Sequence, residues 1–464
     1  MEGSRNDLPD MQSIEQMALD HSLDLQKNRI DARMADEETF NSYRQFFPSV
    51  SVSYRRNRTV ARRDFDNGRY SVQLNVSQPV YDGGKTALRA KLAELNRARI
   101  RDRKILLRNE IRFEARKIYL SVQRAIAQLE IQRASLKRSA ALLERSRVEL
   151  RNGLITRLDY SEIKNRHQSA RLSLKSQKEK LRQAVQDLCI LTGIGVSRFQ
   201  GIRLLDLSEL QINTNRLSHE ELSASASNQH PEMIKARRTL YQAREEHDIA
   251  NNYYLPRIAL TARYGKTGQR WPPETAEWGF GFSISFRGLN STLSNNLGYN
   301  RSQNGTSRSV NSAGKLDLLN ELNNESRILR QRKKLMSARR RVANLRELLP
   351  LRVKNLIQEL WQRRRELDLQ RKTAKTGKKR FQADSIRYEN GNLSLEEYRE
   401  EEMRMIRSTE QLRQKQSSLL LFVARMEREL GLSPRQLQIL KPHYLSQADS
   451  RRFFRNLFSE GLNQ

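Results

Sequence analysis

Two short segments of this chain nearly repeat each other, and each stands between two long amphipathic stretches. They are RNGLITRLDYSEIK, from Arg151 to Lys164, and ENGNLSLEEYREEE, from Glu389 to Glu402. Gly153 corresponds to Gly391 and Asp159 to Glu397, both at the same offset (391 − 153 = 238). Internal repetition of this kind indicates two homologous halves that fold alike.

The earlier part of each half repeats at a shorter offset. Phe47-Pro48 followed by SVSVSY matches Leu255-Pro256 followed by RIALTARY (256 − 48 = 208). The second half must therefore contain about 30 extra residues (238 − 208). The polar, low-complexity run GLNSTLSNNLGYNRSQNGTSRSVNS fits this place, so we predict a polar insertion over 288–314.

Long helices are predicted on both sides of each repeated turn. The stretch from Lys85 to Arg151 contains neither proline nor glycine. Its apolar residues recur every seven positions, which predicts a coiled-coil seam. They are Ala115, Val122, Leu129, Leu136, Leu143 and Leu150. Leu174, Leu181 and Leu188 continue this spacing on a helix that folds back antiparallel.

The second half repeats this helical pattern from Lys315 to Arg387 and from Leu395 to Leu430. Pro350 lies inside the first of these two stretches. We expect it to kink or interrupt the helix, because proline lacks an N–H donor and collides with the preceding turn.

Four short stretches instead alternate apolar residues with mainly Ser, Asn, Gln, Arg or Gly, which predicts strands with one apolar face. The alternating residues are Val50, Val52 and Tyr54; Tyr70, Val72, Leu74 and Val76; Ile258, Leu260, Ala262 and Tyr264; and Trp278, Phe280, Phe282, Ile284 and Phe286. They pair as two hairpins, with loops around Asp66-Asn67-Gly68 and Trp271-Pro272-Pro273. Strands of about 9 to 10 residues have the length of tilted membrane-spanning strands.

Aromatic residues lie at both ends of these strands. Tyr54, Tyr70, Tyr264 and Trp278 lie near the loops, and Tyr81 and Phe286 near the helices. Two aromatic girdles of this kind mark the interfaces of a membrane barrel. A small soluble sheet with aromatic packing is the alternative.

Four strands cannot close a membrane barrel, since the smallest have about eight. A cyclic trimer would supply 3 × 4 = 12 strands continuing into 12 helices. The predicted fold is therefore mainly α with a small β part. Long antiparallel coiled-coil helices form a trimeric α-barrel, and two β-hairpins per chain contribute to a 12-stranded transmembrane β-barrel.

The formal charge of +33 invites a different interpretation, a cytosolic basic coiled-coil scaffold that binds nucleic acid or an anionic membrane. That interpretation does not explain the strands that recur in both halves, so no nucleic-acid partner is expected. We expect that the protein is not an enzyme and that it has neither a cofactor nor a metal site. The histidines form no HExxH pair, DGGKT at Asp82 to Thr86 lacks the first glycine of a phosphate loop, and the single cysteine, Cys189, fits packing.

The order of elements resembles the TolC-like outer-membrane efflux protein family, whose members are trimeric channel-tunnels. The resemblance rests on VSQPVYDGGK (Val76 to Lys85), RYENGNLSLEEY (Arg387 to Tyr398) and LTGI (Leu191 to Ile194), and it covers roughly residues 12 to 432. It implies the outer-membrane channel of a tripartite efflux or type I secretion system. The implied partners are a periplasmic adaptor, an inner-membrane pump (ABC or proton-driven) and outer-membrane lipid, and the helical part would lie in the periplasm.

Residue by residue, the resemblance makes the two repeated turns the periplasmic tips. The expected adaptor-docking residues are Gly153, Leu154, Thr156, Leu158 and Asp159 in the first copy, and Gly391, Ser394 and Leu395 in the second. Glu397 and Glu400 match acidic positions at the closed aperture of the family. Their spacing of three places both on one helix face, so threefold symmetry would build two acidic rings. A soluble acidic turn that balances neighbouring arginines is the alternative.

The predicted segments are 1–84 (first helix and hairpin), 85–193 (helical hairpin), 194–217 (connection), 218–287 (second helix and hairpin), 288–314 (insertion), 315–431 (helical hairpin) and 432–464 (tail). The second half departs from the family pattern, because FRGLNS stands where the first half has PVYDGG. The N-terminal residues MEGSRNDLPDMQ show no basic region followed by an apolar one, so no signal peptide is visible.

Overall fold

In the computed structural model the described residues are 8–59, 67–196, 199–206, 219–288, 291–302, 308–319, 322–431, 444–446 and 450. Their contacts divide into two compact units. One unit holds the sheet and the adjoining helix segments, residues 28–103 and 232–346. The other holds the helical turns, residues 1–27, 104–231 and 347–464. The predicted loop around Asp66 and most of the predicted tail lie outside the described residues.

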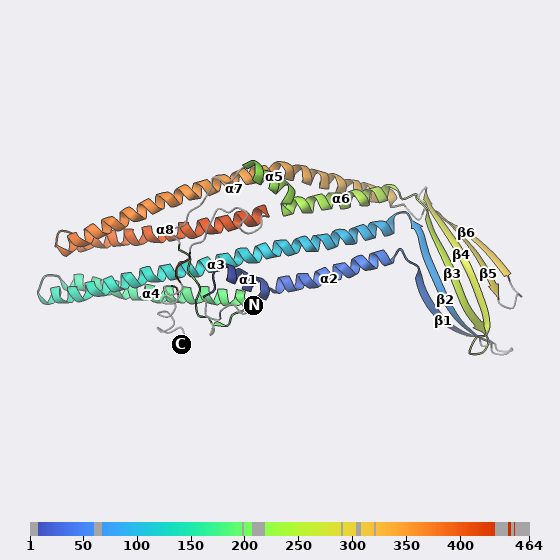
Figure 1. The fold of residues 1–464 in the computed structure, drawn as a ribbon, viewed down its shortest axis with the longest axis horizontal. Coiled ribbons are helices and arrows are strands. Elements are labelled where there is room, and N and C mark those ends of the chain that lie inside the picture. The colour runs from blue at the N-terminus through green and yellow to red at the C-terminus, as the bar shows by residue number, and fades with distance from the viewer. Residues whose placement is uncertain are drawn as a thin grey trace. The chain divides into compact units, whose positions relative to one another are not determined.

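The helices, labelled in Figure 1, are α1 Met11–His21, α2 Leu23–Arg44, α3 Lys85–Arg151, α4 Arg157–Thr192, α5 His219–Gln229, α6 Pro231–Asn251, α7 Asn324–Glu389 and α8 Leu395–Leu430. Within the described residues, none of these helices is long and apolar enough to cross a membrane. Pro350 was predicted to kink or interrupt its helix, and it does not interrupt it: α7 continues through this residue.

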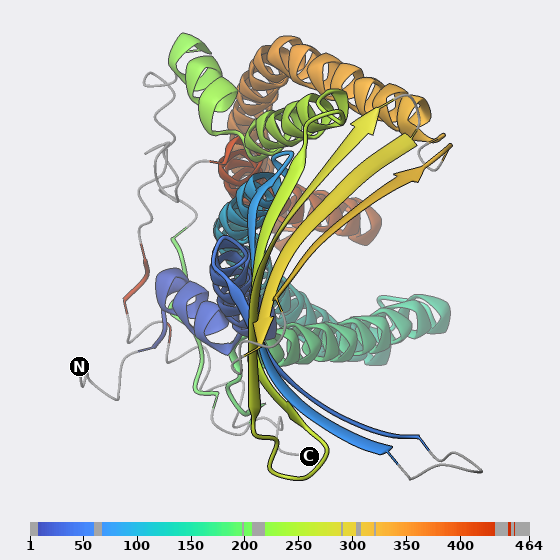
Figure 2. The ribbon, with the colours of Figure 1, turned by 90° about the vertical axis from the view of Figure 1, so that its right-hand side faces the viewer.

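The strands are β1 Ser49–Thr59, β2 Asn67–Asp82, β3 Arg257–Gly268, β4 Thr275–Gly288, β5 Ser291–Ser302 and β6 Arg308–Asp317. They form one antiparallel sheet in chain order, and Figure 2 shows them side by side, bending along their length. Both predicted hairpins are confirmed, as β1–β2 and β3–β4.

The number of strands differs from the prediction, which counted four per chain. The segment predicted as a polar insertion over 288–314 contains β5 and most of β6, which form a third hairpin. This third hairpin also explains why FRGLNS stands where the first half has PVYDGG. In the first half β2 is followed by the helix α3, whereas in the second half β4 is followed by β5, the strand with which it pairs. The predicted total of twelve strands assumed four strands from each of three chains, whereas the described part of this chain contains six.

One face of the sheet carries apolar residues on all six strands. Directly paired residues share a face, and one such row crosses the whole sheet as Val50, Val76, Ala262, Phe280, Tyr299 and Val310. The neighbouring row is polar or glycine, namely Ser51, Asn75, Arg263, Gly279, Asn300 and Ser309. The hairpin β5–β6 therefore continues the amphipathic pattern of the other four strands.

The core of the helical unit follows the predicted seven-residue seam. Ala115, Val122 and Leu129 on α3 are buried and pack in one cluster with Leu181 and Leu188 on α4. Cys189 is also buried in this cluster, as its apolar surroundings predict. Leu136, Leu143 and Leu150, nearer the turn, are half-buried. The helical hairpin α7–α8 buries an equivalent cluster that includes Leu360, Leu367 and Leu419.

Candidate functional site

The two repeated turns have the same backbone hydrogen bonds, atom for atom. In the turn from α3 to α4, the N–H of Gly153 donates to Leu150 O at 3.2 Å and that of Leu154 donates to Glu149 O at 2.8 Å. In the turn from α7 to α8, Gly391 donates to Tyr388 O at 3.1 Å and Asn392 to Arg387 O at 2.8 Å. Both helices thus end in a Schellman motif, which satisfies their last carbonyl groups.

Backbone conformation explains the glycine in each turn. Gly153 has φ of +70° and Gly391 of +77°, a region that residues with a Cβ rarely adopt. A Cβ on either glycine would meet nothing within 4 Å, so crowding plays no part. The glycines are required to stop one helix and reverse the chain into the next.

Each returning helix then begins with a capping box. The Thr156 hydroxyl accepts the N–H of Asp159 at 3.1 Å, and the Asp159 carboxylate accepts the N–H of Thr156 at 3.0 Å. Ser394 and Glu397 make the same reciprocal pair at 3.3 and 3.0 Å. These bonds satisfy amide groups that a helix N-terminus otherwise leaves unpaired.

The capping bonds also change the acidity of both carboxyls. The pKa of Asp159 is lowered by hydrogen bonds from the Thr156 side chain and backbone and by the charge of Arg399. The pKa of Glu397 is lowered in the same way by Ser394. Glu397, expected at the aperture, therefore has a structural role within its own chain, and its carboxylate is the charged form over a wider pH range.

Three further acids of α8 near the second turn are paired with arginines. Glu400, the other expected aperture residue, accepts from Arg404 at 2.8 Å, and its side chain remains 62% exposed. Glu401 lies 2.6 Å from the same arginine. The next acid, Glu402, is buried, and its carboxylate lies 2.6 Å from Arg138 and 3.6 Å from Arg166.

Glu402 is a residue whose role the sequence did not reveal. Arg138 belongs to α3 and Arg166 to α4, so this carboxylate joins the second helical hairpin to the first. A second ion pair, between Arg399 and Glu162 at 3.4 Å, joins the same two hairpins. These partners are separated by more than 230 residues in the chain, so no local pattern identifies them.

The expected docking residues differ in what their side chains present. Leu154 and Leu158 are each 72% exposed, although both are apolar. Thr156 and Asp159 are exposed and use their polar atoms on each other. Leu395 is the first residue of α8, and its side chain lies outside the described part of the structure.

The expected interface aromatics lie on the apolar face of the sheet. Tyr54, Tyr81, Tyr264, Trp278 and Phe286 are all between 39 and 58% exposed. Tyr70 is half-buried, with the Arg56 guanidinium 5.4 Å from its ring centre. Large aromatic side chains exposed together on one sheet face indicate a surface that is covered by something apolar.

Comparison with known proteins agrees with this architecture. Residues 14–194 match the family model described as outer membrane efflux protein. No curated protein sequence is significantly similar to the chain.

Solved structures share the fold over almost the whole length. The outer membrane protein VceC of Vibrio cholerae superimposes with a TM-score of 0.72 at 15% identity, covering 91% of this chain and 96% of that one. The Campylobacter jejuni outer membrane channel CmeC gives 0.72 at 13% identity, covering 96% and 89%. The Neisseria gonorrhoeae outer membrane channel MtrE gives 0.68 at 15%, covering 92% and 90%. The resemblance to the TolC-like outer-membrane efflux proteins is therefore confirmed, by the sequence of residues 14–194 and by a fold shared over 91% of the chain.

Proposed function

We propose that this protein is the outer-membrane channel-tunnel of a tripartite efflux or type I secretion system, through which substrates leave passively. The amphipathic sheet carries the proposal. It exposes an apolar face with Val52 71%, Phe280 60% and Val310 77% accessible. Its opposite face is polar, as a water-filled lumen requires, so lipid is the natural covering of the apolar face. The nucleic-acid scaffold receives no support from the family match.

The open edges of the sheet support a trimer. In the order β1 to β6, strands β1 and β6 are terminal, and their unpaired backbone groups cannot remain open inside a bilayer. Pairing β6 of one copy with β1 of the next closes a ring. Three copies give 18 strands if all six enter the barrel and 12 if β5 and β6 stay outside. The continuous amphipathic pattern favours all six.

Cysteine labelling distinguishes these two barrels in a Cys189→Ala background. Leu297→Cys lies on the apolar face of β5, and Asn296→Cys is the matched control on its polar face. If β5–β6 belongs to the barrel, a water-soluble maleimide labels only the control. Equal labelling of both positions would place the hairpin outside the barrel. A trimer in the outer-membrane fraction that dissociates on heating is expected in either case.

A soluble protein whose DNA affinity falls steeply with salt would overturn the proposed channel in favour of the scaffold.

The helical turns are the proposed docking sites for a periplasmic adaptor that is joined to an inner-membrane pump. Two exposed leucines, Leu154 and Leu158, support this assignment, because exposed apolar residues at a polar tip need a partner surface. Replacing both by Asn should abolish crosslinking to the adaptor while leaving the trimer intact. Unchanged crosslinking would exclude the first turn from docking.

Glu397 and Glu400 are the proposed aperture acids, and substitution by Gln tests them separately from folding. Glutamine at position 397 keeps the capping box, because its amide oxygen still accepts from Ser394. Glu397→Gln with Glu400→Gln should therefore lower cation selectivity and block by divalent ions in planar bilayers. If selectivity and block stay as in the unmodified channel, the two acids do not form the aperture.

A further inference from the structure

Basic residues on the apolar face of the sheet, among the described strands, occur only at the loop end, where β1 turns into β2 and β3 into β4. Rows of paired residues cross the sheet, and the first row from the helices that contains arginine is Val52, Leu74, Tyr264, Trp278, Arg301 and Arg308. Lys266 lies in the next row toward the loops, and Arg56 in the row after it. We call Arg56, Lys266, Arg301 and Arg308 the cationic border.

The acidic strand residues all lie on the other face of the sheet. Over the ranges that the structure describes, the six strands contain three acids, namely Asp82, Glu277 and Asp317. All three belong to polar rows. Two of them form ion pairs there, Glu277 with Arg69 at 3.7 Å and Asp317 with Lys315 at 2.8 Å. The charged strand residues of the apolar face are therefore all positive.

Two members of the border lie directly opposite each other. Arg301 of β5 pairs with Arg308 of β6, and it also pairs with Trp278 of β4. Arg308 is exposed, and Arg301 is half-buried. Like charges at directly opposite positions destabilise a sheet, so this pair suits a negative group that lies against both side chains.

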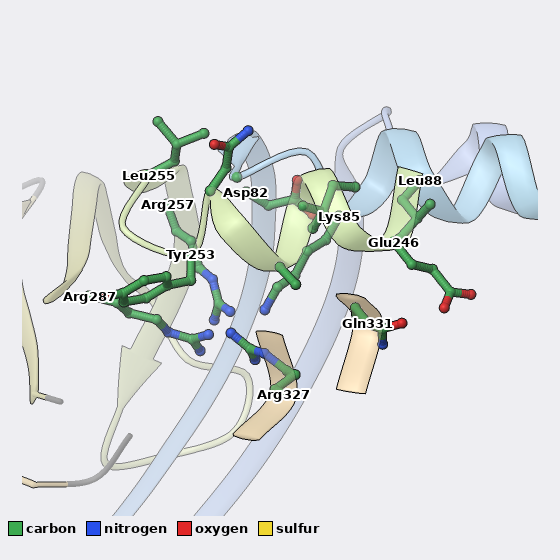
Figure 3. A pocket seen from close by; sticks show the side chains of 14 residues that line it. Asp82, Lys85, Leu88, Glu246, Tyr253, Leu255, Arg257, Arg287, Arg327 and Gln331 are labelled. Carbon is green, nitrogen blue, oxygen red and sulfur yellow. The ribbon is translucent and has the colours of Figure 1, made fainter. Parts of the chain in front are cut away.

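The helix end of the sheet is arranged the other way round. Its arginines, Arg257 and Arg287, lie in polar rows. Figure 3 shows both with Lys85 beside a cavity of about 190 Å³. The neighbouring apolar rows hold residues such as Ile258 and Phe286. The two ends of the apolar face therefore differ in charge, and only the loop end suits an anionic surface.

The border lies at the level of an aromatic girdle. Tyr264 and Trp278 share a row with Arg301 and Arg308, and aromatic girdles mark the membrane interfaces of a barrel. A basic side chain on the lipid face is costly at the middle of a bilayer and far less so near the interface. Its flexible stem also lets the charged end reach the headgroups. Lipid phosphate groups are therefore within reach of the border.

We propose that the cationic border binds lipid headgroups that carry phosphate monoesters, in the leaflet at the loop end. The inference rests on the proposed function, because lipid covers the apolar face only if the sheet enters a membrane barrel. A phosphate monoester carries about −1.5 to −2 charges near neutral pH, which matches the two charges of Arg301 and Arg308. The phosphodiester of an ordinary phospholipid carries a single charge. Each guanidinium also offers paired donors to phosphate oxygens.

Quenching of Trp278 tests this binding, because Trp278 adjoins Arg301 in its row. Trp271→Phe with Trp361→Phe leaves it as the only one of three tryptophans. This full chain is reconstituted in phosphatidylcholine vesicles that contain brominated phosphatidic acid, a lipid with a phosphate monoester. Quenching should show phosphatidic acid enriched at least about tenfold over phosphatidylcholine, since each basic residue near an anionic lipid surface contributes about a fivefold preference.

Arg301→Gln with Arg308→Gln should lower that enrichment at least about tenfold. Arg55→Gln with Arg263→Gln is the matched control, because it removes the same charge from the polar face and should leave the enrichment unchanged. An equal loss in the control would overturn the proposal. Arg56→Gln against Arg55→Gln repeats the comparison with neighbours on opposite faces of β1, and only the first should lose about fivefold.

A second arm tests the chemistry of the headgroup. Brominated phosphatidylglycerol, a phosphodiester, should be enriched less than phosphatidic acid, and equal enrichment would overturn the preference for a monoester. Inorganic phosphate should leave the quenching by phosphatidic acid unchanged. Displacement by inorganic phosphate would assign the border to dissolved anions instead of lipid.

Brominated phosphatidylcholine alone separates this inference from the proposed function. If it does not quench Trp278, the apolar face is not in lipid, and both the membrane barrel and the lipid site are wrong. If it quenches Trp278 while phosphatidic acid is not enriched, the barrel stands and only the lipid site is wrong.

Discussion

The two helical turns have identical backbones and different side-chain surroundings. Both have a Schellman motif followed by a capping box, at an offset of 238 residues (391 − 153). In the second turn, however, the rings of Tyr388 and Tyr398 are stacked with their centres 4.7 Å apart. The corresponding residues of the first turn are Leu150 and Tyr160, so this stack of two rings has no counterpart there. Duplication therefore preserved the groups that reverse the chain and left the outer surface free to diverge.

The divergence makes one turn complement the other. Arg138 and Arg145 of the first hairpin lie 5.8 and 5.4 Å from the rings of Phe381 and Tyr388 in the second. Glu402, between Arg138 and Arg166, corresponds to Lys164 in the first copy (402 − 238 = 164). In these three contacts the first copy supplies the cations and the second supplies the acid and the aromatic rings, whereas the Arg399–Glu162 pair has the opposite polarity.

The largest effect is expected at Glu402. Glu402→Ala leaves Arg138 and Arg166 without their buried counter-charge, which should lower the free energy of opening of the tips by about 3 kcal/mol. Native-state hydrogen exchange of α4 and α8 amides measures this opening. Lys164→Ala at the corresponding exposed position should change it by less than about 0.5 kcal/mol. Equal effects at the two positions would mean that the Glu402 ion pairs do not stabilise the tips more than the exposed Lys164 does.

The glycines test the part that the two turns share. Gly153→Ala and Gly391→Ala should each destabilise the local turn by about 1–2 kcal/mol, because alanine is strained at positive φ. Asparagine tolerates this conformation, so Gly→Asn at either position should have a smaller effect. The same exchange experiment reads both turns in one molecule. A large difference between the two alanine variants would contradict the equivalence of the backbones.

A smaller effect is expected at the caps. Thr156→Ala and Ser394→Ala should each cost about 1 kcal/mol, because each removes the acceptor for an amide of the first helical turn. The loss should appear as faster exchange of the Asp159 and Glu397 amides, respectively, with the other turn unchanged. If these two amides exchange as slowly in the variants as in the unmodified protein, the caps do not stabilise these helix ends.

Much of this architecture is predictable from the sequence. The offset between Gly153 and Gly391 located both turns, and the spacing of Ala115, Val122 and Leu129 identified the buried seam. The alternation from Trp278 to Phe286 identified β4 as a strand with one apolar face. Each of these signals is local, because neighbouring positions on one element carry the whole pattern.

Other features were not predicted from the sequence, and particular residues show the physical reason. In β5 the alternation of Leu293, Leu297 and Tyr299 is interrupted by Asn295 and diluted by serine and asparagine, so its polar composition hid a strand that pairs residue by residue with β4. Composition indicates a loop there, but the neighbouring strand decides the structure. The role of Glu402 depends on a partner from the other half of the chain, Arg138, so no local pattern identifies it. A cavity beside Lys85 is lined by residues of six helices and strands that are far apart in the sequence, so it was not predictable either.

Acidification gives the finest comparison of the two turns. Asp159 and Glu397 both have a folded-state pKa below the ordinary values of 3.8 and 4.5. The folded state therefore binds fewer protons than the unfolded state. The stabilisation is complete above the ordinary pKa and is lost as pH falls through the folded one. Loss at the second turn should begin at the higher pH, because the ordinary pKa of glutamate is higher.

Glu397→Gln provides the control within one molecule. Its capping amide does not titrate, so the opening free energy of the second turn, obtained from amide exchange corrected for the intrinsic rate at each pH, should become insensitive to pH in this range, while the first turn keeps its acid response through Asp159. If the second turn of this variant still loosens with acid, another group carries the response, and Glu397 is not the proton-sensitive part of the cap. If both turns lose their response together, the two hairpins open as one cooperative unit through the Arg399–Glu162 and Glu402 ion pairs.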